Sequence, residues 1–202
     1  MADQPLSELT QSLSACTHCA ERFAATKTAH EPRPVYQLSS TARLCIAGQA
    51  PGLRVHHSGR PFTDPSGDRL RDWMGIEEEA FYDPAKLAIV PMAFCFPGYN
   101  AKNHDLPPPP DCAKLWRAQV FTAMPQIALI VTVGRSALNW HRPETRARSL
   151  SDIVAGGLID GDIPILPLPH PSWRNNAWLK GNPWFETDIL PVLRAEVSRL
   201  LG

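Results

Sequence analysis

Apolar and polar positions along the chain alternate between two patterns. Short apolar runs that end at, or just before, glycine or proline predict buried strands; they cover 43–48, 87–91, 127–133 and 163–168. Segments with helical spacing or capping residues follow these runs. A strand and then a helix, repeated four times, is typical of a parallel sheet with helices on both faces. We therefore expect an α/β protein with a three-layer α/β/α architecture and a central four-stranded parallel sheet, in a single domain spanning residues 1–202.

Helices are expected on either side of these strands. Apolar residues at helical spacing predict a first helix over 5–15. Capping residues and prolines predict the others: from Ser66 or Asp64 to Met74, from Asp111 to Met124, after Gly134, and from Asn182 onward with an interruption at Pro191. The segments 49–65, 96–110 and 169–181 are expected to be loops. Ligands of such folds bind beyond the carboxyl ends of the strands, so these loops are where a site is expected.

Composition narrows the class of protein. The chain has 44% hydrophobic and 20% charged residues, ordinary values for a soluble globular protein. It has no apolar run long enough to cross a membrane, and its N-terminus lacks the pattern of a signal peptide. We therefore expect a cytoplasmic protein with no membrane partner. The formal net charge of zero disfavours a protein that coats duplex DNA, and it leaves room for a local basic patch.

Four of the five cysteines lie where a metal group would need them. Cys16 and Cys19 form a C-x2-C pair, and Cys95 and Cys112 bound a proline-rich loop, whereas Cys45 lies in an expected strand as a small buried hydrophobe. A disulfide is disfavoured in a cytosolic chain. The residues alone leave three interpretations open: a zinc site, an iron–sulfur cluster, and four unrelated thiols.

The first expected strand runs directly into a tight loop, Gly48-Gln49-Ala50-Pro51-Gly52. Glycine allows the backbone to approach a ligand closely, and proline stiffens the turn. The loop can therefore present backbone N–H groups and one polar side chain to a small planar ligand. Tight turns after strands are common, so an ordinary turn is an equally good interpretation of this motif alone.

A second candidate segment follows in the same loop. Phe62 lies between a proline and a threonine, a setting suited to stacking on a base, although a lone phenylalanine more often anchors a loop. Ser66 and Gly67 begin an expected helix, where their N–H groups can either bind a phosphate or take part in capping.

The last expected strand leads into a His-Pro-Ser loop, His170-Pro171-Ser172-Trp173-Arg174. A histidine at the carboxyl edge of a sheet can stabilise negative charge that develops on a substrate oxygen. Trp173 and Arg174 have the chemistry to enter a groove or to contact a phosphate. A lone histidine is more often structural, but this combination favours a functional loop.

Together these motifs resemble the iron–sulfur uracil-DNA glycosylase families, in their broad-specificity and thermophile-type branches. In those families a C-x2-C pair precedes the first strand, a Gly-Glu/Leu-Ala-Pro-Gly/Ala loop ends it, a Gly-Arg-Pro/Met-Phe segment follows, and a His-Pro-Ser loop comes near the end. The chain matches this layout from Cys16 to about Trp178, as a divergent member. The resemblance implies a monomeric DNA glycosylase of base excision repair, which flips a damaged base out of DNA and hydrolyses its N-glycosidic bond.

The resemblance also implies roles for individual residues. Cys16, Cys19, Cys95 and Cys112 would hold a four-iron–four-sulfur cluster. The flipped base would stack on Phe62 and be lined by the loop of Gly48, Gln49, Ala50, Pro51 and Gly52. His170 would stabilise the charge on the base, and Gln49 and Asp64 are candidates for positioning the attacking water. The DNA-contacting residues would be Ser66, Gly67, Ser172, Trp173 and Arg174.

Two departures separate this chain from those families. Many relatives have Glu where this chain has Gln49, and a glutamine can orient a water but cannot take its proton. Relatives often have Asn, which recognises the uracil edge, where this chain has Pro91. The base that is removed is therefore left open. Two rival hypotheses stay open as well: a non-catalytic nucleic-acid-binding protein on the same iron–sulfur fold, and an unrelated cytosolic metal protein.

Overall fold

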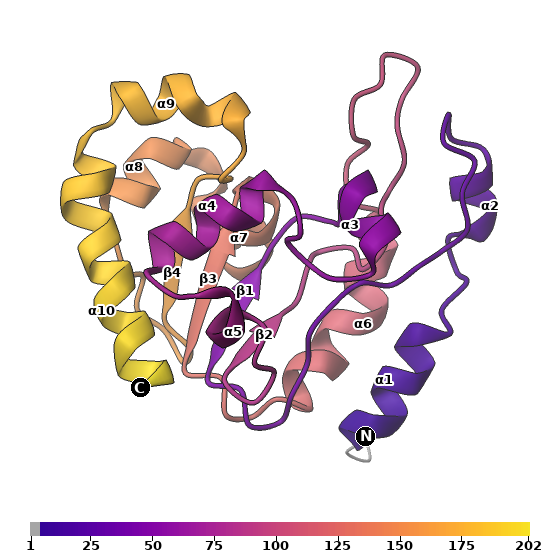
Figure 1. The fold of residues 1–202 in the computed structure, drawn as a ribbon, viewed down its shortest axis with the longest axis horizontal. Coiled ribbons are helices and arrows are strands. Elements are labelled where there is room, and N and C mark those ends of the chain that lie inside the picture. Colours follow the sequence, from indigo (N-terminus) through magenta and orange to yellow (C-terminus); the bar gives the residue numbers. More distant parts are fainter. Residues whose placement is uncertain (1–4) are drawn as a thin grey trace.

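Four parallel strands form one sheet at the centre of the molecule, which a computed structural model describes over residues 5–202 (Figure 1). The strands are β1 (Leu44–Ala47), β2 (Leu87–Ile89), β3 (Leu129–Val133) and β4 (Ile165–Leu168). They lie in the order β2-β1-β3-β4, and every adjacent pair is parallel. All four are buried along their whole length, because helices cover both faces of the sheet. The expected α/β class and four-stranded parallel sheet are confirmed.

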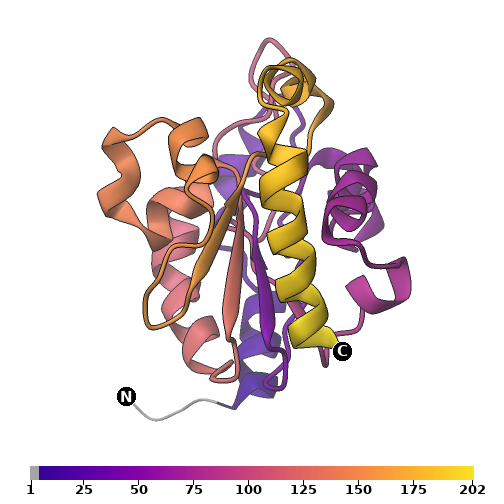
Figure 2. The same cartoon turned by 90° about the vertical axis from the view of Figure 1, so that its left-hand side faces the viewer.

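Two helical layers enclose this sheet (Figure 2). One face is covered by α4 (Pro65–Met74), α5 (Glu78–Phe81) and α10 (Leu190–Leu201), and the other by α1 (Leu6–Ser14), α6 (Pro110–Thr122) and α7 (Arg135–His141). Alternate residues of β1 enter different cores: Leu44 and Ile46 belong to the first, Cys45 and Ala47 to the second. Cys45 is fully buried among apolar side chains, and burial raises the pKa of its thiol to about 12. It is the buried hydrophobe that the sequence predicted.

Short helical segments are the main features that the sequence analysis missed. They are α2 (Ala20–Ala24), α3 (Leu53–Ser58), α5, α8 (Leu150–Ala155), α9 (Asn176–Gly181) and the 3₁₀ turns η1 (Pro143–Ala147) and η2 (Trp173–Asn175). The prediction of loops over 49–65 and 169–181 is therefore wrong in part, because α3 lies in the first and η2 and α9 lie in the second. Helices this short span too few turns to give a hydrophobic period, and tertiary packing rather than propensity stabilises them.

The long helices begin close to where their sequences indicate. Asp64 caps α4, and its side chain accepts a hydrogen bond from the Gly67 amide at 3.3 Å. Asp111, the expected cap of α6, instead lies in the first turn, because Pro110 already has a helical φ and needs no N–H partner there. The expected interruption at Pro191 is a π-helical turn, η3 (Phe185–Ile189), with the proline in the first turn of α10 that follows.

Within residues 5–202, no helix has the length and apolar character that crossing a membrane requires. The sequence-based expectation about a signal peptide concerns residues 1–4 as well, and these lie outside the described residues.

Candidate functional site

The carboxyl ends of the strands, at the top of the view in Figure 1, bring three of the predicted segments together. Gly48 follows β1, and a Cβ atom added to it would lie 3.5 Å from Cζ of the Phe62 ring. The Gln49 side chain lies over Gly134, where an added Cβ would be 3.4 Å from Gln49 Nε2. Gly134 follows β3 with φ +83°, a conformation that glycine adopts readily. Because Gly48 and Gly134 have no side chains, the side chains of Phe62 and Gln49 can lie directly against the backbone at this edge of the sheet.

The rest of the first loop turns away from this edge into α3. Pro51 is buried and Ala50 is half-buried. Gly52 is the N-cap residue of α3, and its carbonyl accepts a hydrogen bond from the His56 amide at 2.8 Å. The structure thus places Gly48 and Gln49 beside Phe62, while Gly52 belongs to the start of a helix.

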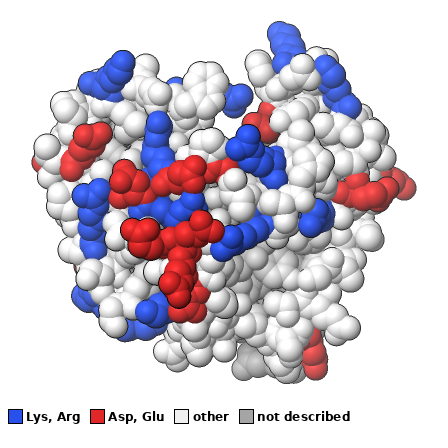
Figure 3. All heavy atoms as spheres, in the orientation of Figure 1, with Lys and Arg blue, Asp and Glu red and all other residues white. Residues whose placement is uncertain are grey.

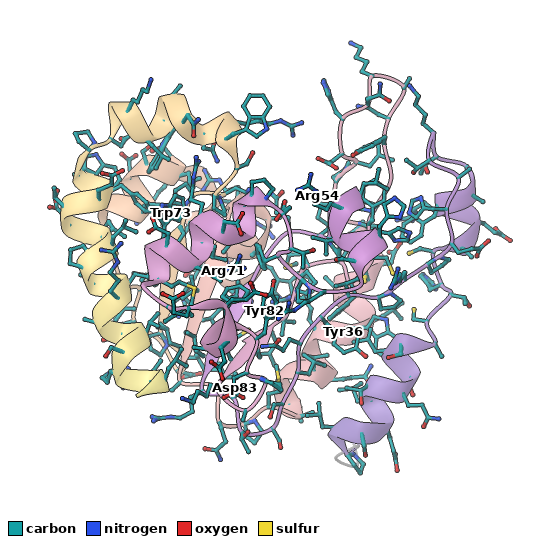
Figure 4. The ribbon with its side chains drawn as sticks, viewed as in Figure 1. Tyr36, Arg54, Arg71, Trp73, Tyr82 and Asp83 are labelled. Carbon is teal, nitrogen blue, oxygen red and sulfur yellow. The ribbon has the colours of Figure 1, made fainter. Side chains whose placement is uncertain are left out.

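The backbone of Phe62 is held in an unusual conformation by its neighbours. Its φ is +54°, in the left-handed region. Its carbonyl accepts hydrogen bonds from Arg71 Nη1 at 3.4 Å and from Tyr82 Oη at 3.2 Å. Figure 4 shows Arg71 and Tyr82 on the side of the sheet that α4 covers. These contacts hold the backbone of Phe62, and its ring packs edge-on against Phe81 with 6.0 Å between the ring centroids.

Gly67 has a steric role in this arrangement. A Cβ atom there would lie only 1.8 Å from the Phe62 carbonyl oxygen, so no larger residue fits without moving Phe62. The Gly67 amide already donates to the backbone carbonyl of Asp64 at 2.8 Å and to its side chain. The amide that the sequence suggested for a phosphate is thus occupied, whereas Ser66 lies half-buried in the first turn of α4.

His170 follows β4 and lies near two carboxylates. Its Nδ1 is buried and has no hydrogen-bond partner within the described residues. Burial lowers the pKa of His170, while the nearby Asp64 and Asp105 carboxylates raise it and Arg174 lowers it further. The net shift is downward, so the imidazole is neutral at neutral pH. The Asn175 side chain donates to the His170 carbonyl at 2.7 Å and fixes the loop.

The loop after His170 presents Trp173 to solvent. Its side chain is 72% exposed, more than any other large hydrophobic residue in the described part of the chain. The Ser172 side chain accepts from the Arg174 amide at 3.2 Å, and its carbonyl accepts from Arg69 Nη1 at 3.3 Å. Ser172 therefore braces the turn that projects Trp173 and Arg174.

A hairpin over residues 98–106 brings Asp105 near His170. The sequence analysis predicted only a loop there. Tyr99 and Asp105 form an antiparallel bridge, and the Asn100 side chain accepts from the amides of Lys102 and His104 at 2.9 and 3.0 Å. Asp105 also faces Arg174, with 3.7 Å between Oδ2 and Nη1. Asn100 and Asn103, both typical turn formers, were the signal in the sequence.

Cationic side chains border the space between this hairpin and the Trp173 turn. Figure 3 shows lysine and arginine atoms on both rims of the hollow at the top of the molecule. Arg54 of α3 is exposed and makes no side-chain hydrogen bond or ion pair within residues 5–202, and Figure 4 places it between the two sides. The rim is therefore a local basic patch on a chain of zero net charge.

The four predicted ligand cysteines line one cavity. Cys16, Cys19, Cys95 and Cys112 are its only ionisable lining residues, and the others are apolar side chains and prolines. The Phe94 amide donates to Cys112 Sγ at 3.4 Å. Burial raises the pKa of Cys95 to about 12 and that of Cys112 to about 11, and mutual repulsion between the thiolates adds to both shifts. A bound cation is what would favour the four thiolates together.

The cysteines of the cavity do not form a grouped metal-ligand set within the described residues. Within residues 5–202, no three Cys, His, Asp or Glu side chains are grouped closely enough to hold a single ion. Four sulfurs around one zinc at about 2.3 Å would be such a group. The structure therefore shows no metal site at these cysteines, and the iron–sulfur cluster that the resemblance implies stays a prediction.

Comparison with protein families identifies the fold. Residues 34–194 match the family described as the uracil DNA glycosylase superfamily. The match includes the segments of Gly48, Phe62 and His170, and it begins after Cys16 and Cys19, so it leaves the iron–sulfur branch of the family untested. Because the match covers most of the chain and the parallel sheet agrees with it, this protein belongs to the uracil DNA glycosylase superfamily.

Proposed function

We propose that this protein is a DNA glycosylase that removes uracil or another deaminated base in base excision repair. Members of its family are hydrolases that act on DNA. The observation that supports the proposal most is the meeting of Gly48, Phe62 and the His170 loop at the carboxyl edge of the sheet. These segments are far apart in the sequence, and folds of this class bind their ligands at that edge.

The target base is accommodated beside Phe62. Because Phe62 is fixed through its carbonyl and the adjacent Gly67, its ring provides a rigid surface on which an extruded base stacks. Gly48, which has no side chain, lets the edge of this ring lie close to the end of β1. A preformed surface lowers the cost of holding the base outside the helix.

His170 acts on the leaving base. As the C1′–N bond breaks, its electron pair moves onto the base, and negative charge grows on a base oxygen. A neutral imidazole can donate a hydrogen bond through Nε2–H to that oxygen, and burial makes this interaction stronger than it would be in water. The base leaves as a hydrogen-bonded anion and then takes a proton from solvent.

Gln49 and Asp64 are assigned to the attacking water. The water adds its oxygen to C1′ and gives up one proton. Gln49 can only orient the water, so we assign the acceptance of that proton to Asp64, whose charge acts on the nearby His170. An acid at position 64 would thereby replace the acid that relatives have at the position of Gln49.

The basic rim of the space between the hairpin over 98–106 and the Trp173 turn is assigned to the DNA strand. Trp173 is exposed and suited to fill the gap that an extruded nucleotide leaves, while Arg174 and Arg54 are assigned to phosphates.

The cysteine cavity is assigned to a four-iron–four-sulfur cluster held by Cys16, Cys19, Cys95 and Cys112. The meeting of all four cysteines in one cavity that apolar side chains and prolines otherwise line supports this assignment. When bound, the cluster supplies a rigid link between the α1–α2 connection, the segment of Cys95 and α6. The chemical steps of hydrolysis use only the side chains at the strand ends, and the cluster takes no direct part in them.

A base-release assay tests the proposal. Purified protein should release free base from at least one member of a panel of oligonucleotides that contain uracil, hypoxanthine or xanthine, opposite each normal base and in single strands. If DNA is retained at low salt but no base is released from any member, the protein is a non-catalytic DNA-binding module. Pro91 is the residue that makes this alternative worth testing, since it has no amide to recognise uracil.

A further inference from the structure

A second cavity lies away from the strand-end site, between α6, the end of α7 and the segment that precedes β4. Its volume is about 360 Å³, within the range of about 300–1,000 Å³ that is typical of sites for small molecules. Neither the family match nor the proposed glycosylase function assigns anything to it. Its lining combines two arginines with aromatic and branched aliphatic side chains.

Arg117 is the most unusual residue of this cavity. It is 1% exposed, and no carboxylate of the described residues forms an ion pair with it. Its Nη1 donates to the carbonyls of Val90 and Pro91, both at 3.0 Å, and its Nε is buried without a partner. Burial lowers its pKa to about 10, so it remains charged at neutral pH. A buried cation without an anionic partner is costly, and an anion in the cavity would offset that cost.

The neighbouring residues keep the cavity positive. Nε2 of His141 lies against Nη2 of Arg117, and burial together with the charges of Arg117 and Arg142 lowers the pKa of His141 to about 3. His141 is therefore neutral. The charged lining residues are Arg117, Arg142 and the exposed Asp162, which sum to one positive charge, and Arg142 also lies 3.9 Å from the exposed carboxylate of Glu144, which does not line the cavity. This balance is suited to a monoanion.

Two aromatic side chains set the shape of the ligand. Trp140 is 41% exposed although it lines the cavity, and Phe121 lies edge-on to His141 with 5.3 Å between ring centroids. A planar apolar group would bury the exposed part of Trp140 while its charged end reaches toward the arginines.

We propose that the cavity of Arg117 and Trp140 is a binding site for a small aromatic carboxylate. The carboxylate would balance the unpaired arginine charge, and the ring would stack on Trp140. This inference is independent of the glycosylase function, because the cavity lies on the face of the sheet that α6 and α7 cover and shares no residue with the strand-end site.

Calorimetric titration with 1-naphthoate tests the proposal. We expect saturable binding to one site, at least tenfold weaker binding of the neutral 1-naphthalenemethanol, and at least tenfold weaker binding of inorganic phosphate, which lacks the ring. Trp140→Ala should weaken naphthoate binding at least tenfold and still fold, because the side chain is partly exposed. Asp162→Asn should tighten binding two- to threefold by removing the opposing charge, whereas Asp160→Asn, whose carboxylate does not line the cavity, should leave it unchanged.

Several outcomes would overturn the proposal. One is the absence of saturable naphthoate binding at millimolar concentration. Another is equal binding of the neutral alcohol, which would remove the role of the arginine charge. A third is binding that survives Trp140→Ala but is lost in His170→Ala, which would place the ligand in the strand-end site.

Discussion

The strand-end site and the cysteine cavity are neighbours that are built in opposite ways. At the strand ends, backbone contacts fix the site: the amides of Met92 and Ala93 donate to the carbonyls of Gly48 and Gln49 at 2.9 and 3.0 Å. The cavity is formed by side chains from separate segments, and its thiols repel one another once they ionise. The comparison teaches that the fold alone can form the first region, whereas the proposed cluster would stabilise the second by binding its thiolates.

The two regions are also connected through one segment. Ala93 bonds to Gln49, and Cys95, two residues later, lines the cavity. Loss of a bound cluster should therefore loosen the backbone that supports Gln49. Variants at the strand ends, in contrast, should leave the cavity intact.

The largest effect is expected at His170. His170→Ala removes the hydrogen bond to the developing anion, and base release should fall by about 10²–10³-fold, the usual cost of losing one such donor. Iron content should stay unchanged, because the cavity does not depend on this residue. His57→Ala, a change of an exposed histidine on α3, is the matched control and should retain activity. Equal loss in both variants would contradict the assignment of His170.

The next effect is expected from the cysteines. Cys112→Ser should abolish visible charge-transfer absorption and bound iron and sulfide, lower the melting temperature, and reduce base release through the loosened segment 93–95. Cys45→Ala is the control: it should cost about 0.5–3 kcal/mol as a core change but keep its iron. A colourless, zinc-loaded wild-type protein would defeat the cluster proposal.

Gly67→Ala should have a moderate effect on the strand-end site alone. The new methyl group would displace the Phe62 carbonyl, and strain of this kind typically costs about 1–3 kcal/mol. Thermal unfolding and base release should both fall, while iron content stays the same. Gly181→Ala places its methyl group in open space and serves as the control. If Gly67→Ala is as stable and active as wild type, the rigid Phe62 surface is not needed.

A feature of these two regions could be predicted from the sequence when neighbouring residues along the chain determine it. The four strands and the places of Gly48 and His170 follow from local apolar patterns, which a sequence displays directly. The steric role of Gly67 depends on the approach of Phe62, and the hairpin over 98–106 depends on the Asn100 side chain. The first requires knowledge of a close approach that local patterns do not contain, whereas the second had a local signal in Asn100 and Asn103.

Stability should fall in acid because of buried histidines. The pKa values of His170 and His141 are lowered by burial, that of His141 to about 3 from an ordinary 6.5. The unfolded chain therefore takes up protons first, and stability that is present above pH 6.5 is lost below it, by at most about 1.4 kcal/mol per pH unit for each histidine. Urea unfolding at several pH values should show a flatter dependence for His141→Gln, and an unchanged slope would contradict this account.

The smallest effect is expected from the ion pair that joins the hairpin to the Trp173 turn. Asp105 competes with DNA phosphates for Arg174, and both side chains are about half exposed, so the pair is worth only about 0.2–1 kcal/mol. Asp105→Asn should therefore raise DNA affinity about two- to fivefold at low salt. Arg174→Gln should lower it and reduce the salt dependence by about one counterion.

Fluorescence anisotropy with a labelled oligonucleotide at several salt concentrations measures both changes. Arg199→Gln is the matched control, because Arg199 has similar exposure and also pairs with a carboxylate, but lies on α10. If Asp105→Asn weakens binding instead, the ion pair positions the Trp173 turn for DNA rather than competing with it. The strand-end region would then depend in part on a side-chain contact, the pair of Asp105 and Arg174, as the cysteine cavity depends on side chains. Only the segment of Gly48 and Gln49 would be held by backbone hydrogen bonds.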